Sequence, residues 1–198
     1  MNKDVIVLII MESDLFGNEH TIFIGRYDII EFCYMAEIST ICISIYIRQL
    51  LSILKKNNLD GLCEFIDPGR ISQKVVQLFM FCRFHWLLAI IYPSNELIYY
   101  MDSPTLKMFK TQKGIKDRKK NQLESSKGKE HCCPLQEGIV EREYYVMKYM
   151  KEIIDDPNCS IITNFKEKAI YTQHEFDALR MQWDEYVDDF IPIDETLD

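Results

Sequence analysis

The chain has 198 residues, 47% of them hydrophobic, and this is enough apolar material for one well-buried core. Its formal net charge of −8 argues against a protein built around phosphate-backbone contacts, because such proteins need clustered cations. We therefore expect a single domain over residues 1–198, a monomer that does not bind nucleic acid directly.

The cysteines indicate a reducing compartment. Their number is odd, and most lie in apolar runs without paired metal-ligand spacing. His131, Cys132 and Cys133 are adjacent, but no second pair stands at a distance typical of a zinc site. We expect buried thiols, and neither a metal nor a cofactor. The seven residues are Cys33, Cys42, Cys63, Cys82, Cys132, Cys133 and Cys159.

The first apolar run, from Val5 to Met11, is too short to cross a bilayer, and Glu12 and Asp14 follow it at once. No basic and apolar leader precedes it. These features predict an intracellular protein, in the nucleus or the cytoplasm or both, without a membrane partner.

Two helices are expected in the first third of the chain. Apolar residues repeat at spacings of three and four between Ser39 and Lys56, and Asn57 to Gly61 ends that helix. A shorter helix is expected around Asp28 to Tyr34, and the sequence Asp-Pro-Gly at 67–69 predicts a turn.

The middle of the chain predicts a β-hairpin. The run from Phe84 to Tyr92 is aromatic and branched, residues 93–96 have turn chemistry, and Leu97 to Met101 is again strand-like.

Antiparallel pairing of the two strands about the turn at 93–96 places Tyr92 opposite Leu97 and Leu87 opposite Asp102. His85 then lies two positions beyond Leu87, on the same face of the hairpin as Asp102 and within reach of it.

The rest of the chain predicts an insert, two helices and a tail. Residues 113–130 are rich in Lys, Arg, Ser and Gly, which indicates an exposed basic insert or, less well supported, a nuclear-import signal. After Gly138 an apolar stripe at helical spacing runs to the Asp-Asp-Pro sequence at 155–157. Thr172 and Glu175 form a capping box that begins a last helix, and residues 191–198 are expected to be a frayed acidic tail.

A histidine at the start of one strand and a carboxylate at the end of its partner can serve as a general base and the group that orients it. Alone, such a pair is more often ordinary polar decoration of a sheet edge. The segment from Cys133 to Met150, a loop feeding directly into a helix, shifts the balance towards the functional interpretation.

This segment and the hairpin resemble the SUMO (sentrin/ubiquitin-like) protease family, particularly its plant transposon-associated branch. The family pattern is His-Trp on a strand, Asp-Ser after the next strand, then Gln, a Gly-containing loop, and an acidic-Cys-Gly triplet that opens a helix. The resemblance implies an α+β fold of the papain-like cysteine protease type, with a central mixed or antiparallel sheet and helices on both sides. It implies SUMO, another ubiquitin-like modifier, or its conjugates as the partner.

The resemblance also implies a role for each matched residue. His85 matches the base, Asp102 the orienting carboxylate, and Gln136 the side-chain donor of the oxyanion hole. Trp86 matches the aromatic residue that covers the modifier's narrow C-terminal tail, although a plain core role is equally open. The resemblance continues in Asp28–Phe32, Asn164–Phe165 and Tyr171–Trp183, and so covers most of the chain.

The pattern breaks at the nucleophile, where this chain has Arg142, with Glu143 in place of the following glycine. A cysteine at a helix start is favoured as the thiolate, whereas a guanidinium has no usable lone pair and stays protonated. We therefore expect no hydrolysis of the bond after a modifier's C-terminal glycine. Cys132 and Cys133 precede Gln136 and are not expected to replace the missing thiol.

Further departures concern the substrate groove. The stretch from Ile71 to Phe84 is shorter than in the family, and a polar segment before His131 replaces an apolar strand. A second tryptophan of many members has no equivalent here, and Ile24 lies near its position.

Three functions stay open at this point. The first is a pseudoprotease that binds a modifier tail without cutting it. The second is an active thiol protease, through another cysteine or a true cysteine codon at position 142. The third is a decayed mobile-element product, with at most a protein-interaction role for its acidic C-terminal helix.

Overall fold

The protein is described by a computed structural model, in two compact units: Met1–Phe84 with Thr172–Asp198, and His85–Tyr171. Both contain helices and antiparallel strands, which confirms the α+β class; the expectation of a single domain stays a prediction. Among the described residues, no helix is long and apolar enough to cross a membrane. The described residues are 6–36, 38–62, 64–65, 88–92, 97–102, 105–110, 131–136, 142–156, 165 and 168–191.

The first unit begins with an antiparallel hairpin of β1 (Ile6–Met11) and β2 (His20–Gly25). The short helix α1 (Ser13–Phe16) connects the strands and ends at Gly17, whose φ of +79° lies in the left-handed region that favours glycine. Alternate residues of β1 face opposite ways: Ile9 is fully buried, whereas Leu8 is 58% exposed.

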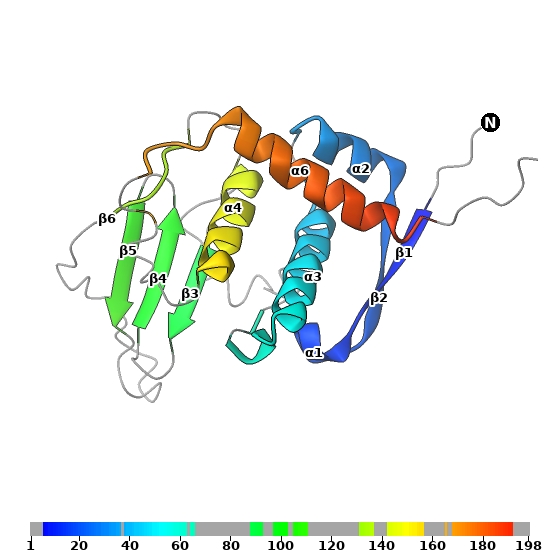
Figure 1. The fold of residues 1–198 in the computed structure, drawn as a ribbon, viewed down its shortest axis with the longest axis horizontal. Helices are drawn as coiled ribbons and strands as arrows, with labels where there is room; N and C mark the ends of the chain where they lie inside the picture. Colours follow the sequence, from blue (N-terminus) through cyan, green and yellow to red (C-terminus); the bar gives the residue numbers. More distant parts are fainter. Residues whose placement is uncertain are drawn as a thin grey trace, which may run out of the picture. The chain divides into compact units, whose positions relative to one another are not determined.

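Three further helices are found among the described residues of this unit (Figure 1). They are α2 (Arg26–Cys33), α3 (Thr40–Lys56) and α6 (Gln173–Asp188), and the 3-10 turn η1 (Asp60–Leu62) follows α3. Both α2 and α3 contact β2, and α6 contacts α2 and α3. All three expected helices are confirmed. The helix α2 begins at Arg26, two residues earlier than predicted.

The indole of Trp183 joins these three helices. It is fully buried on α6 and stacks on Phe32 of α2, with ring centroids 3.9 Å apart. Its Nε1–H donates a hydrogen bond of 3.2 Å to the backbone carbonyl of Cys42 on α3. Burial of a large aromatic ring is among the strongest single contributions to a core, so we expect Trp183 to contribute strongly to the packing of α2, α3 and α6.

Asp28 organises the starts of two helices. Its carboxylate accepts a hydrogen bond of 3.0 Å from the backbone N–H of Gly25, the N-cap of α2. The other oxygen accepts one of 3.1 Å from the hydroxyl of Ser39, the N-cap of α3. The structure therefore gives Asp28, one of the residues in the family resemblance, a clear structural role.

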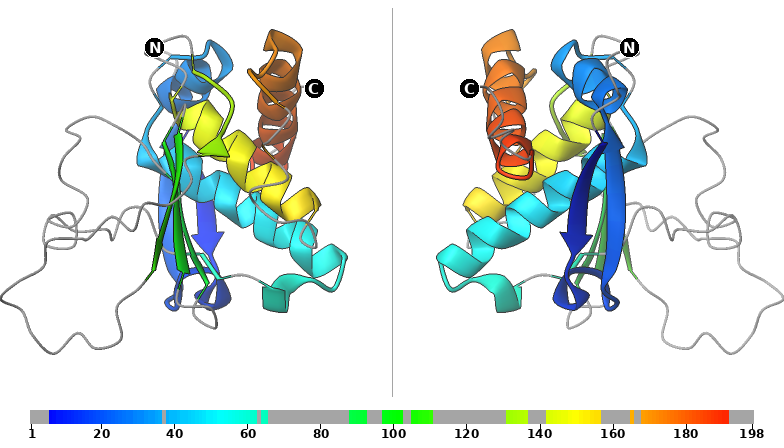
Figure 2. Two further views of the ribbon diagram at one scale, coloured as in Figure 1. Left: turned by 90° about the vertical axis from the view of Figure 1, so that its left-hand side faces the viewer. Right: turned by 90° about the vertical axis from the view of Figure 1, so that its right-hand side faces the viewer.

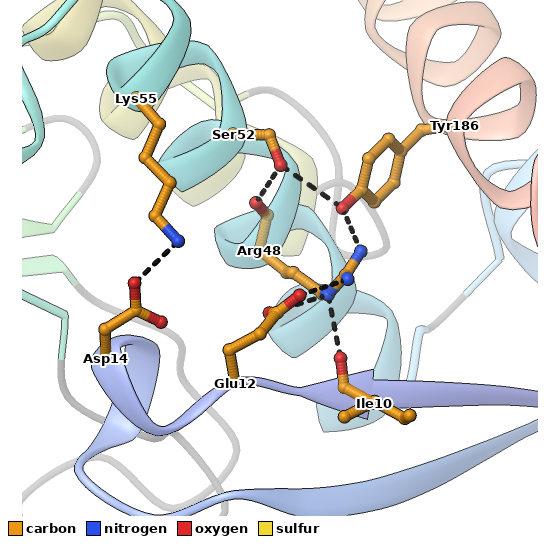
Figure 3. Close-up of polar contacts among 7 residues, drawn as sticks. All are labelled: Ile10, Glu12, Asp14, Arg48, Ser52, Lys55 and Tyr186. Atoms are coloured by element: carbon orange, nitrogen blue, oxygen red, sulfur yellow. Dashed lines mark hydrogen bonds and ion pairs between the residues drawn. The ribbon is translucent and has the colours of Figure 1, made fainter.

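Arg48 on α3 holds the end of the hairpin (Figure 3). Its guanidinium donates to the carboxylate of Glu12, to the backbone carbonyl of Ile10 at 2.9 Å, and to the Tyr186 hydroxyl on α6 at 2.5 Å. The ring of Phe190 also lies 4.9 Å from the guanidinium carbon. One side chain thus ties β1, α3 and α6 together.

The second unit contains an antiparallel sheet of strand order β3-β4-β5-β6. The helix α4 (Arg142–Asp155) contacts β3 and lies beside it (Figures 1 and 2). Its end at Asp155 is as predicted, and burial extends beyond the predicted apolar stripe to every residue from 143 to 150. The strands are β3 (Leu88–Tyr92), β4 (Leu97–Asp102), β5 (Thr105–Lys110) and β6 (His131–Cys132).

Several sequence-based expectations lie outside the described residues. These are the turns at 67–69 and 93–96, the basic insert at 113–130, the shortened stretch from Ile71 to Phe84, and residues 192–198 of the tail.

Candidate functional site

The hairpin that carries the proposed histidine and aspartate has the predicted register. Tyr92 pairs with Leu97, and the ladder continues to Leu88 opposite Met101. Asp102 is the last residue of β4. The described residues do not include His85, Trp86 and Leu87. That His85 and Asp102 lie on the same face of the hairpin therefore stays a prediction.

The end of β4 lies two strands away from β6, the strand that leads towards Gln136. Asp102 pairs with Thr105 at the start of β5, and Thr105 pairs with Cys132 at the end of β6. Adjacent strands are separated by about 4.8 Å, which places the backbones of Asp102 and Cys132 about 10 Å apart. Gln136 follows Cys132 by four residues. Asp102 and the segment that leads to Gln136 therefore lie at the same end of one sheet, two strands apart.

The helix α4 begins at Arg142, where the resemblance places the nucleophile. Every residue from 143 to 150 is buried, including the charged residues Glu143 and Lys148. A helix buried all round belongs to the core of a protein rather than to its surface. Arg142 itself is partly exposed, so the helix starts at the boundary between core and solvent.

Two tyrosine hydroxyls of α4 hold the segment that precedes Gln136. Tyr145 donates a hydrogen bond of 2.7 Å to the carbonyl of Leu135, and Tyr149 donates one of 3.0 Å to the carbonyl of Pro134. The N–H of Leu135 donates a hydrogen bond of 2.7 Å to the carbonyl of Ala169. Gln136 is partly exposed and comes directly after this fastened segment.

An aromatic cluster supports these tyrosines. Tyr145 meets Tyr171 edge to face at 5.2 Å between ring centroids, and Tyr149 meets Phe165 in the same way at 5.4 Å. Glu152 on α4 accepts hydrogen bonds from the Tyr171 hydroxyl at 3.0 Å and from Lys168 at 2.8 Å. The rings are thereby fixed from more than one side.

The thiols with resolved pKa shifts lack the surroundings of a nucleophile. Burial raises the pKa of the Cys42 thiol to about 12. Burial, followed by the carboxylate of Asp184, raises the pKa of Cys33. A reactive cysteine needs the opposite, a pKa below its usual value. Cys133 is buried, and the Tyr149 hydroxyl lies 3.8 Å from its sulfur.

Over the described ranges, no group of three or more His, Cys, Asp or Glu side chains could hold a metal ion. A shallow pocket of about 410 Å³ lies in the first unit, between α2 and α6, and is lined by Cys33, Asp177, Arg180, Met181 and Asp184. Arg180 there bonds to Asp177 and to the carbonyl of Cys33, so much of the pocket's charge is internally paired. None of the residues matched to the family site lies in it.

Tyr145 and Tyr149 were given no role from the sequence. Their spacing of four residues, which puts both hydroxyls on one face of a helix, was the available signal.

Comparisons with protein-family profiles, with curated proteins and with solved structures find no match for this chain. The resemblance to the SUMO protease family is carried by the motif residues.

Proposed function

We propose that this chain is a papain-like domain of the SUMO-protease type that binds the C-terminal tail of a ubiquitin-like modifier without cutting it. The observation that carries the proposal is that Asp102 and the segment leading to Gln136 lie at the same end of one sheet, and that two tyrosines of α4 hold this segment. The proposal adds His85 and Trp86 to this site from the sequence motif.

In this proposal, Arg142 at the nucleophile position abolishes acyl transfer, while the groups that would bind the modifier tail are retained. Acyl transfer needs a lone pair at the helix start, and a guanidinium has none at any accessible pH. Loss of the nucleophile of a triad leaves only about 10³-fold acceleration over water, which is negligible for an isopeptide bond. The remaining groups, an amide donor at Gln136 and the proposed aromatic cover at Trp86, act on binding alone.

The charge at the helix start favours one form of the ligand. The N-terminal end of α4 carries the positive end of the helix dipole, and Arg142 stands there partly exposed, with the buried Glu143 as the next residue. A processed modifier ends in a free carboxylate, which such a site favours over the neutral amide of a conjugate or precursor. We therefore propose the mature modifier, with its free C-terminal glycine, as the preferred ligand.

Isothermal titration with a SUMO-like protein tests the proposal. The mature form should bind at micromolar concentration, and a form with an amidated C-terminus should bind more weakly. Gln136→Ala and Arg142→Ala should each reduce the affinity. Glu19→Gln, at an exposed residue of the first unit, should leave it unchanged and serves as the matched control. Absence of heat at high micromolar concentrations of the mature form would refute the proposal.

A further inference from the structure

The backbone before Gln136 is fixed at three consecutive polar groups. The carbonyls of Pro134 and Leu135 accept hydrogen bonds from Tyr149 and Tyr145, and the N–H of Leu135 bonds to Ala169. Two neighbouring carbonyls and the N–H between them are therefore held, which restricts rotation as well as translation of the segment.

The donors themselves have little freedom to move. The side chains of Tyr145 and Tyr149 belong to residues that are 3% and 1% exposed, and both rings contact the ring of Tyr171. A hydroxyl on a rigid, buried ring holds its acceptor more firmly than one on a flexible surface side chain. Water has little access to replace either hydroxyl.

We propose that Tyr145 and Tyr149 are positioning residues for Gln136: by bonding the carbonyls of Leu135 and Pro134 they hold the Gln136 amide in a fixed place relative to α4. The functional part of this proposal rests on the proposed role of Gln136 as donor to a ligand carbonyl or carboxylate. Such a donor has to be held within about 0.5 Å of its productive position, and a loop residue needs supporting hydrogen bonds to achieve this.

The test uses hydroxyl deletions in the full chain. Tyr145→Phe and Tyr149→Phe each remove one hydrogen bond to the segment and keep the ring. Tyr186→Phe is the matched control, because it also deletes one tyrosine hydroxyl, the one that accepts from Arg48, and Tyr186 belongs to the first unit. Circular dichroism and thermal melting establish that each variant is folded.

Hydrogen exchange at the Leu135 amide and ¹⁵N relaxation of the Gln136 side-chain amide are the two readouts, since neither requires a ligand. Loss of one hydrogen bond should raise the exchange rate of Leu135 about fivefold and increase the motion of the Gln136 amide. Tyr186→Phe should leave both unchanged even if it lowers the melting temperature equally. Unchanged exchange and relaxation in folded Tyr145→Phe/Tyr149→Phe would overturn the positioning role.

Binding of the mature modifier separates this inference from the proposed function. If both hold, the double variant should lose about tenfold in affinity while Tyr186→Phe retains it. If the wild-type chain binds no modifier, the proposed function fails, and the exchange data still decide the positioning role. If the double variant mobilises Gln136 but binds as tightly as wild type, positioning of this amide for the ligand is refuted.

Discussion

Arg48 and Glu12 form a two-point ion pair, with Nη2 to Oε1 at 2.5 Å and Nε to Oε2 at 3.0 Å, between α3 and the residue after β1. The Arg48 side chain is only 15% exposed, and it also reaches Ile10 and Tyr186. A nearby ion pair, Lys55 with Asp14, has the same charges but stands largely in solvent (Figure 3). The two pairs offer a direct comparison within one unit.

Arg48→Met should destabilise the chain by about 2 to 3 kcal/mol, because it leaves the Glu12 carboxylate and the Ile10 carbonyl without their donor. Lys55→Met should cost less than about 0.5 kcal/mol, as expected for an exposed pair. Guanidinium chloride unfolding measures both values. Equal effects of the two substitutions would show that the Arg48 network contributes no more than a surface ion pair.

Thr172→Ala should cost about 1 kcal/mol by removing the N-cap of α6. Thr172 accepts a hydrogen bond from the Glu175 N–H, and the Glu175 carboxylate accepts one of 2.8 Å from the Thr172 N–H. Thr172→Ser keeps the hydroxyl and should recover most of the loss, as measured by the same unfolding experiment. A serine variant as unstable as the alanine variant would argue against the cap.

The parts of the fold that follow local rules were predictable from the sequence. The spacing of Ile43, Ile47, Leu50 and Leu54 predicts α3, and all four are buried there. The capping box at Thr172 fixes the start of α6. The turn chemistry at 93–96 gives the pairing of Tyr92 with Leu97, because the register of a hairpin follows from its loop length.

Features that depend on distant partners were missed. The β1–β2 hairpin was not predicted because β1 is apolar on both faces: Leu8 is as apolar as the buried Ile9, and no alternation marks the strand. The strand β5 was likewise missed. The acceptors of Tyr145 and Tyr149 are backbone carbonyls, which leave no trace in residue identity. Arg48 reads in the sequence as an ordinary helix surface residue.

The Cys42 thiol should make stability depend on pH above 9. Burial raises its folded-state pKa from the usual 9.0 to about 12, so the folded state disfavours the thiolate. This contribution is fully present below pH 9 and is lost as the pH rises from 9 to 12, by about 1.4 kcal/mol per pH unit.

Cys42→Ala lacks this titration. The difference in unfolding free energy between wild type and variant should be constant below pH 8 and should then shift in favour of the variant. A difference that stays constant up to pH 11 would contradict the raised pKa of this thiol.

Restoring the thiol at position 142 tests the proposed site most directly. Arg142→Cys with Glu143→Gly should react with a SUMO-like modifier whose C-terminal glycine carries a vinyl sulfone, giving an adduct one modifier heavier by mass spectrometry. Wild type and the matched Arg142→Ser/Glu143→Gly variant should give none, and His85→Ala in the cysteine background should slow the reaction at least about 100-fold. A folded Arg142→Cys/Glu143→Gly variant that forms no adduct, or a wild-type chain that forms one equally well, would contradict the assignment of Arg142 to the nucleophile position.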